Sequence, residues 1–297
     1  MKNLVSGMCV AVLGLAAMAM PGVSHAGNVG YYKFTHPSGC EPASPAAAIA
    51  AGGHTPVALS ALNAASLAPL QGLVIMTCLA PYPGSSAVDA AVENGLVVMI
   101  DTDNPYTGAL LPGKPALQLS GQQTFCQTNV SIVPNADITS GPGGVLTDDS
   151  LDVGKPGGSG GQCSTLSPVE VASLPTGARP YVSAVFWPTA ITAFSYPFGR
   201  GTVVFSSSQW MRFLPGTTWP DEYNVTGSRI YYANAIAWMM TQVPPPATTT
   251  CASEGYKGTQ LTWCKNICES GLTGKALDTW IQRWISKYRE LPYCAVD

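Results

Sequence analysis

Two short apolar runs stand out in the first third of the chain, at residues 73–76 and 96–100. No polar residue alternates within either run, so both faces of the strands that they predict must be covered, as in a parallel sheet enclosed by helices. The segment between them, residues 86–93, has the spacing of a helix. The serines at 85–86 can cap its start, and the Asn-Gly pair at 94–95 can end it. The pattern therefore predicts a strand–helix–strand crossover.

Weaker signals of the same kind continue on both sides of this crossover. Strands that alternate with helices predict an α/β fold with a doubly wound, mostly parallel sheet. If the strand order is the flavodoxin-like one, the first and third strands are neighbours. The helix expected over residues 230–240 has Tyr232, Ile236 and Met239/Met240 on one face. The other elements are expected as strands over residues 30–34, 56–59, 181–187, 193–196 and 201–206 and as helices over residues 45–51 and 230–240.

Composition divides the chain into four parts. Residues 1–26 have the features of a secretory signal peptide, with an apolar core and a small-residue cleavage site. Residues 27–242 form the α/β domain, and its Gly/Pro/Ser-rich insertion at 107–173 is irregular, as is typical of a binding loop or a disordered one. Residues 243–250 are an extended Pro/Thr linker. Residues 251–297 are a separate, small helical module.

The small module contains two predicted helices. The first, residues 259–269, presents Cys264 and Cys268 on one side, and Thr273 can cap the second. So short a module cannot build a large core, and we expect two disulfides to join its helices. The second helix has an apolar stripe at helical spacing, made of Leu277, Trp280, Ile281, Trp284, Ile285 and Tyr288.

The cysteines favour an oxidising compartment. Of the nine in the sequence, Cys9 belongs to the signal peptide and the others divide evenly across the linker. In an exported protein this favours disulfides over metal thiolates, and no Cys-x-x-Cys or His-rich spacing indicates zinc.

The expected disulfide pairs follow from the predicted elements. If strands one and three are neighbours, the cysteines that follow them form a Cys40–Cys78 bridge. By elimination Cys126 pairs with Cys163. Since Cys264 and Cys268 lie one turn apart on the same helix, each is expected to pair outward, with Cys251 or Cys294.

Charge and hydropathy restrict the partners. Charged residues make up only 10% of the chain, and its net charge is -3. Neither side of the linker has the basic excess that binding to a phosphate backbone needs, which excludes nucleic acid. After the signal peptide no stretch is long and apolar enough to span a bilayer. We therefore expect a secreted or periplasmic protein without a cofactor, whose partner is a small ligand, a glycan or a surface protein.

The sharpest local signal is Asp101, Thr102, Asp103 and Asn104, which follow the second apolar run directly. Ligands bind at the carboxyl edge of open α/β sheets, so these residues are ligand-binding candidates. Four apolar residues followed by Asp-x-Asp resemble the first motif of haloacid-dehalogenase-type phosphatases. That resemblance implies a metal-assisted hydrolase in which Asp101 attacks phosphorus and Asp103 is the general acid. Pro105 departs from the motif, and we favour the alternative that these carboxylates cap loops or bind calcium.

Two further groups of polar residues are candidates. Asp148, Asp149 and Asp152 form an acidic patch, which is either a calcium site or, as we favour, a solvated turn. Residues at the carboxyl edge form the second group, which would stack on a sugar, pair with a carboxylate or simply pack over the sheet end. They are Gln209, Trp210 and Arg212 after the last long strand. His36 lies at the same edge beside Cys40, where the alternatives are a Cys40–His36 nucleophile pair and, as we favour, an oxidised Cys40.

The order of parts resembles a class I glutamine-amidotransferase-like domain, a flavodoxin-related fold. The matching pieces are L-V-I-M-T-C, S-A-V-D-A-A-V-E-N-G, L-V-V-M-I-D, Y-P-F-G-R-G-T-V-V-F-S-S-S-Q-W and Y-Y-A-N-A-I-A-W. Enzymes of that family have a nucleophilic Cys after the central strand and a downstream His and Glu. Here the strand continues into Asp101, and no His follows His54. The tail looks like an accessory module of exported bacterial proteins.

These observations predict a non-enzymatic exported protein that binds a ligand or a surface partner. One alternative is a metal-assisted hydrolase that uses Asp101 and Asp103. The other is protein docking through the C-terminal module.

Overall fold

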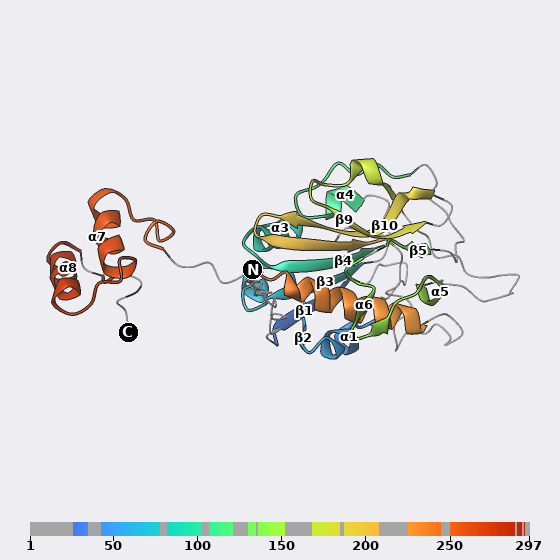
Figure 1. Ribbon diagram of the computed structural model, residues 1–297, viewed down its shortest axis with the longest axis horizontal. Coiled ribbons are helices and arrows are strands. Elements are labelled where there is room, and N and C mark those ends of the chain that lie inside the picture. The colour runs from blue at the N-terminus through green and yellow to red at the C-terminus, as the bar shows by residue number, and fades with distance from the viewer. Residues whose placement is uncertain are drawn as a thin grey trace, which may run out of the picture. The chain divides into compact units, whose positions relative to one another are not determined.

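The chain forms two compact units that divide between Val243 and Pro244. Figure 1 shows the computed structural model, and the two units are described separately. Within the described residues, no helix combines the length and the apolar character needed to cross a membrane. The structure describes residues 26–34, 43–77, 82–102, 107–120, 130–134, 136–151, 168–184, 187–207, 225–244, 250–288, 290–292 and 294.

The first unit is built on a nine-stranded mixed sheet with the order β2-β1-β3-β4-β11-β10-β9-β5, in which β8 also pairs with β10. Its first five strands are parallel: β2 (Thr55–Ala58), β1 (Asn28–Phe34), β3 (Gly72–Thr77), β4 (Val97–Thr102) and β11 (Gly201–Ser206). The others join antiparallel: β10 (Trp187–Phe198), β9 (Arg179–Ala184), β5 (Val130–Ile132) and β8 (Val169–Glu170). The first and third strands are neighbours, as expected, but the antiparallel extension was not predicted.

Helices cover both faces of the parallel strands, which explains why β3 and β4 are buried along their whole length. On one face lie α1 (Ala46–Ala51) and α6 (Val225–Thr241), and Figure 1 shows α6 lying across the sheet. On the other face lie α2 (Ala64–Leu67) and α3 (Ser85–Glu93). The crossover from β3 through α3 to β4 is therefore confirmed.

The start of α3 differs from the prediction. Its N-cap is Gly84, and no serine side chain caps it. Gly84 has φ 83°, and a Cβ there would lie 2.2 Å from the carbonyl oxygen of Leu62. The close approach of α3 to the segment before α2 therefore requires glycine at this position. The end of the helix is as predicted, with Asn94 as C-cap and Gly95 at φ 116°.

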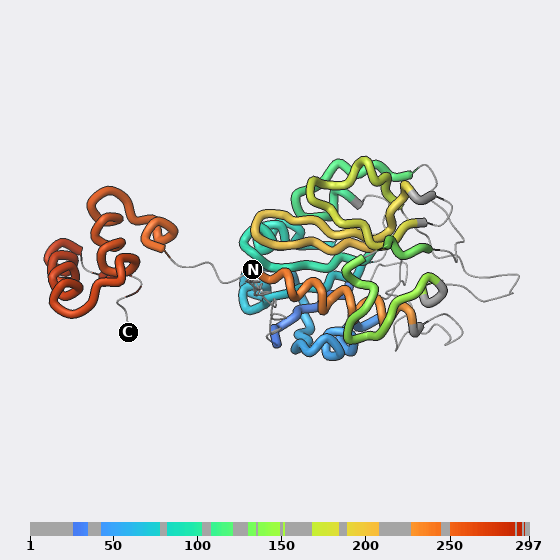
Figure 2. Tube along the Cα trace, in the orientation of Figure 1, coloured from blue at the N-terminus to red at the C-terminus, as the bar shows by residue number. Residues whose placement is uncertain are grey.

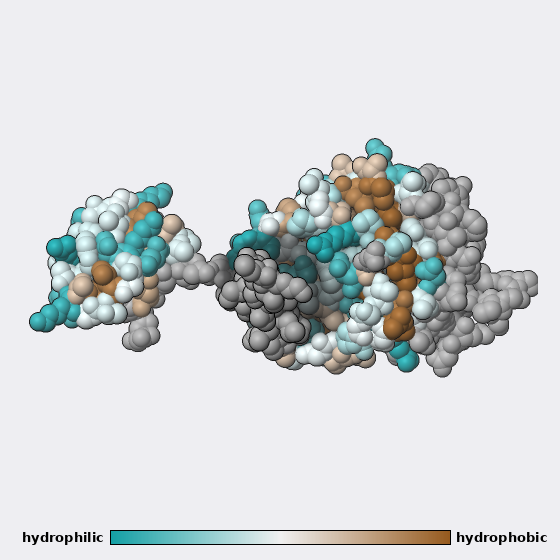
Figure 3. Space-filling view, in the orientation of Figure 1, coloured by the Kyte–Doolittle hydropathy of each residue, from teal (hydrophilic) through white to brown (hydrophobic). Residues whose placement is uncertain are grey.

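The described part of the insertion is more ordered than its composition predicts. It contains α4 (Thr107–Leu110), β6 (Ser140–Gly141), β7 (Gly144–Val145), α5 (Asp148–Leu151), the 3-10 helix η1 (Val171–Ser173) and two strands of the main sheet. It folds back against α6 (Figure 2), where Asn234 accepts from Gly143 N at 2.9 Å and donates to the carbonyls of Ile138 and Gly144, both at 3.0 Å. Figure 3 shows an apolar strip on this side of the unit. The expectation of an irregular loop is wrong for these residues because long-range contacts supply the order that local periodicity lacks.

The second unit contains α7 (Gly258–Cys268) and α8 (Lys275–Lys287). The disulfide Cys251–Cys264 joins α7 to the segment before it, and Cys268–Cys294 joins α7 to the segment after α8. The outward pairing of the two α7 cysteines is thus confirmed. The N-cap of α8 is Gly274 and has no side-chain cap, so the expectation for Thr273 is wrong. Of the predicted stripe, Trp284 is fully buried but Ile285 is 52% exposed. The visible face of the module is mostly polar (Figure 3).

His54 makes the stability of the first unit depend on pH. It precedes β2, is 5% exposed, and its Nδ1 accepts from Gly27 N at 3.4 Å. Burial lowers the pKa of His54 from its ordinary 6.5, because the imidazolium would lose water. The unfolded chain therefore binds more protons than the native one below about pH 7. We expect the free energy of unfolding to fall as pH drops through the ordinary pKa of histidine towards the lower native one.

Urea unfolding of the first unit at a series of pH values checks this, with His54→Gln as the matched variant. The variant should have a flatter pH dependence between about pH 7.5 and about pH 5.5. Equal slopes in the two proteins would contradict the assignment.

Candidate functional site

Asp101 lies inside β4, not in the loop after it. It pairs in register with Met76 of β3 on one side and Ser206 of β11 on the other. These two ladders extend the strand beyond the predicted apolar run. Side chains alternate between the faces of a strand, so Asp101 shares a face with Val97 and Met99, which pack in the core under α6. Its side chain is 0% exposed, so it is enclosed in the core and does not face solvent at the sheet edge.

The partner of Asp101 comes from α6. The hydroxyl of Tyr232 donates a hydrogen bond to Oδ2 of Asp101. The direction of α6 explains the meeting: its last residues, Met239 and Met240, lie against Gly72 at the start of β3. The first turns of α6 therefore lie over the carboxyl ends of the parallel strands. Tyr232 reaches Asp101 from there.

Tyr231 and Ser206 complete a buried polar group, called here the Asp–Tyr cluster (Asp101, Ser206, Tyr231 and Tyr232). The rings of the two tyrosines meet edge to face, with centroids 5.6 Å apart. Burial raises the pKa of Tyr231 well above its ordinary value, and the charge of Asp101 raises it further, while a hydrogen bond with Ser206 opposes the shift. All four side chains are 0% exposed. The cluster is thus enclosed between the sheet and α6.

A second buried hydroxyl pair lies on the antiparallel strands. The hydroxyls of Tyr181 in β9 and Ser195 in β10 are 2.7 Å apart. Tyr181 also packs edge to face on Trp238 of α6, with centroids 5.4 Å apart. Burial raises the pKa of Tyr181, and the Ser195 hydrogen bond opposes that rise. This pair extends the polar contacts under α6 onto the antiparallel part of the sheet.

The chemistry open to the Asp–Tyr cluster is limited by its enclosure. Tyrosines with raised pKa values stay protonated at neutral pH and act as hydrogen-bond donors. An attacking carboxylate needs an approach to its substrate, whereas Asp101 is covered by α6 and held by Tyr232. The arrangement suits a polar contact that fixes α6 on the sheet.

Asp148 also serves a local contact. Its Oδ1 accepts from Ile132 N at 2.7 Å and its Oδ2 accepts from the Ser131 hydroxyl at 3.1 Å. It thereby ties α5 to β5 at the far edge of the sheet. Strands β11, β10 and β9 lie between β5 and β4. Asp148 therefore lies at the β5 edge of the sheet, whereas Asp101 lies in β4 in its middle.

Most of the other predicted site residues lie outside the described residues. Thr102 is described and fully buried at the end of β4. Asp149 lies in α5, but its side chain is outside the description. The cysteines of the predicted Cys40–Cys78 and Cys126–Cys163 bridges also lie outside the described residues. The remaining candidates outside the description are His36, Asp103, Asn104, Asp152, Gln209, Trp210 and Arg212.

Sequence reasoning missed that Tyr231, Tyr232 and Ser206 would meet Asp101. Tyr232 was assigned only to the apolar face of its helix, and that face is buried as predicted. The signal present in the sequence was the pair Tyr231 and Tyr232 near the start of the helix predicted over residues 230–240. The strand predicted before that helix, residues 201–206, ends in Ser206. Within the described residues, the only metal-type grouping of His, Cys, Asp or Glu is Cys251, Cys264 and Cys268 in the second unit.

The sequence matches no protein-family model and no curated protein. Among solved structures, the chain is similar to the cytoplasmic protein STM3548 from Salmonella typhimurium, with a TM-score of 0.42 and 10% sequence identity. The match covers 72% of this chain and 98% of that one.

Proposed function

We propose that this protein is an exported, non-enzymatic binding protein. The observation that supports this best is the state of Asp101, the first of the two carboxylates in the hydrolase alternative. Its side chain is 0% exposed and accepts a hydrogen bond from Tyr232. A carboxylate held in this way stabilises the fold and is not available to attack phosphorus. The α/β unit then acts as a scaffold, and binding falls to its loops and to the C-terminal module.

We further infer that the scaffold is a doubly wound, amidotransferase-like domain. The order β2-β1-β3-β4-β11 of its parallel strands and the helices on both faces support this. The amidase activity of that family is not carried over, because no His follows His54 in the sequence. Fold by itself does not assign a function. The secretory signal predicted from the sequence and the two disulfides of the tail support export.

The surface chemistry of the C-terminal module suits it to contact a partner. The guanidinium of Arg283 lies 4.6 Å from the ring centroid of Trp280, and Nζ of Lys287 lies 5.4 Å from that of Trp263. Both rings are only partly buried. Rings with adjacent cations suit flat partners that offer apolar faces and polar or anionic edges, such as a glycan or a protein surface.

Turnover assays separate binding from hydrolysis. The full chain, with and without Mg²⁺ or Ca²⁺, is given phosphate esters, glycosides and amides, beside the variant Asp101→Asn. We expect no turnover above that of the variant and no rise in melting temperature with either ion. Turnover that Asp101→Asn abolishes would support the metal-assisted hydrolase instead.

A binding screen tests the partner contact directly. The full chain is applied to immobilised glycans and cell-surface extracts, beside Trp280→Ala and the control Thr279→Ala, which changes an exposed neighbour on the same helix. Trp280→Ala should weaken binding by about 1–2 kcal/mol, or roughly fivefold to thirtyfold, and the control should not. Equal retention of both variants would assign binding to the α/β unit.

A further inference from the structure

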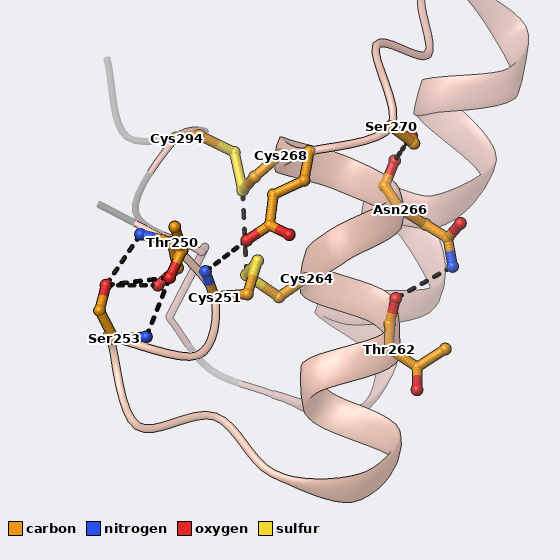
Figure 4. Close-up of a disulfide and its surroundings, with 10 residues drawn as sticks. Thr250, Cys251, Ser253, Thr262, Cys264, Asn266, Cys268, Ser270 and Cys294 are labelled. Atoms are coloured by element: carbon orange, nitrogen blue, oxygen red, sulfur yellow. Dashed lines mark hydrogen bonds between the residues drawn. A yellow bond between two sulfur atoms is a disulfide. The ribbon is translucent and has the colours of Figure 1, made fainter. Parts of the chain in front are cut away.

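The two disulfides of the C-terminal module pack against each other, so that cysteine sulfurs from separate segments form one cluster. The Sγ atoms of Cys251, Cys264 and Cys268 all lie within 4.8 Å of one another. Those of Cys264 and Cys268, which belong to different disulfides, are 4.0 Å apart. Cys294 joins the group through its bond to Cys268. Figure 4 shows the two disulfides facing each other beside α7.

Two sulfurs of this cluster that belong to different disulfides have the spacing of two ligands in a tetrahedral metal site. Zinc binds thiolate sulfur at about 2.3 Å, which places two ligands of a tetrahedron about 3.8 Å apart. The 4.0 Å between Cys264 and Cys268 is close to that edge length. These two residues are at i and i+4 on α7, the separation by which a helix presents two zinc ligands on one face. Cys251 precedes α7 and Cys294 follows α8, so they approach from outside the helix.

We propose that, when its disulfides are reduced, the module binds one Zn²⁺ through Cys251, Cys264, Cys268 and Cys294. Each disulfide takes two electrons and two protons from a dithiol, which becomes a cyclic disulfide. The four thiols then release four protons as their sulfurs bind the ion. The oxidised and zinc-bound forms are alternative ways of joining the same three segments. The redox state of the compartment selects between them.

Exposure predicts the order in which the disulfides are reduced. Cys294 is exposed and Cys268 partly so, whereas Cys251 and Cys264 are 0% exposed. A dithiol therefore attacks Sγ of Cys294 first, and Cys268 leaves as a thiolate. The second thiol of the reductant then releases Cys294. The freed Cys268 sulfur is already 4.0 Å from that of Cys264, where the metal site begins.

Contacts other than the disulfides keep the four cysteines near one another. Glu269 Oε1 accepts from Cys251 N at 2.7 Å, which holds the start of the module against the end of α7. The indole N–H of Trp284 donates to the carbonyl of Glu290 at 2.5 Å, which draws the segment before Cys294 onto α8. Tyr256 packs edge to face on Trp284, with centroids 5.3 Å apart. The reduced module regains these contacts as it binds the ion, so metal binding and folding of the module are coupled.

Cobalt binding by the full chain tests the proposal. The protein is reduced with a dithiol without oxygen, freed of reductant and titrated with Co²⁺, whose tetrahedral tetrathiolate complex has characteristic visible bands. We expect one Co²⁺ per chain with those bands, their loss on adding Zn²⁺, and none in the oxidised protein. Cys268→Ala should weaken binding about 100-fold or more, since even losing an outer-shell partner costs 10–100-fold. Cys126→Ala, outside the module, is the matched control.

A second variant keeps the test decisive if Cys268→Ala does not fold. Zinc sites accept histidine in place of one cysteine, so Cys268→His should retain Co²⁺ with bands shifted towards those of a Cys₃His site. Two results would overturn the proposal. One is a reduced chain that binds no Co²⁺, and the other is a Cys268→His variant whose spectrum equals that of the unaltered protein.

Discussion

Replacing Cys268 and Cys294 together by alanine is expected to unfold the C-terminal module in oxidising buffer. The disulfide closes a loop with a sequence separation of 26, and the other disulfide one of 13. Chain-entropy arguments give about 3.5 kcal/mol for the first loop and about 3 kcal/mol for the second. Among the described residues of the module, the buried core consists of Cys251, Cys264, Ile267 and Trp284. So small a core does not compensate for either loss.

Hydrogen exchange of backbone amides measures this effect. Amides of α7 and α8 should lose their protection in the double variant, whereas those of β3 and β4 should keep theirs, because the two units are separately compact. Unchanged protection of α7 and α8 would contradict the prediction. Zn²⁺ is not expected to restore protection here, because the double variant lacks two of the four proposed ligands.

Tyr232→Phe is expected to destabilise the first unit by about 2–3 kcal/mol. The change removes the hydroxyl that donates to Asp101 and leaves the ring in place. Hydrogen bonds to charged groups contribute about 1.5–3 kcal/mol, and a buried acceptor that loses its donor adds a desolvation cost. For a domain of this size, the melting temperature should fall by about 4–12 °C.

Tyr231→Phe is the matched control, because it removes the neighbouring hydroxyl, which bonds to the neutral Ser206. We expect it to cost about 1 kcal/mol, clearly less than Tyr232→Phe. Chemical denaturation of both variants, read by circular dichroism, compares them. Equal losses would mean that the Asp101–Tyr232 contact contributes no more than an ordinary buried hydroxyl pair.

The Asp–Tyr cluster also bears on how the two functional proposals can fail. If Tyr232→Phe destabilises the unit and no turnover is found, Asp101 is a structural residue and the binding proposal stands. If Tyr232→Phe is neutral and turnover depends on Asp101, then α6 moves away from Asp101 during function. The zinc proposal is independent of both results, because it concerns only the second unit.

Much of the architecture could be predicted from the sequence. The unbroken apolar runs of β3 and β4 identified a covered parallel pair, because strands exposed on one face would show alternating polar residues. Cys264 and Cys268 lie one turn apart on α7, so their side chains extend from the same face of the helix. This spacing predicted that each would pair with a cysteine outside the helix. The caps of α3 and α8 were predicted less well, since backbone close approach rather than side-chain capping determined Gly84.

The sequence by itself determined the crossover, the division into two units and the disulfide-joined helical tail, because these depend on periodicity and on spacing within a few residues. Only the tertiary structure decided the environment of Asp101. Its hydrogen-bond partner, Tyr232, is 131 residues further along the chain. Local patterns carry no information about which helix covers a strand end. The same carboxylate could face solvent or a core, and the packing of α6 places it in the core.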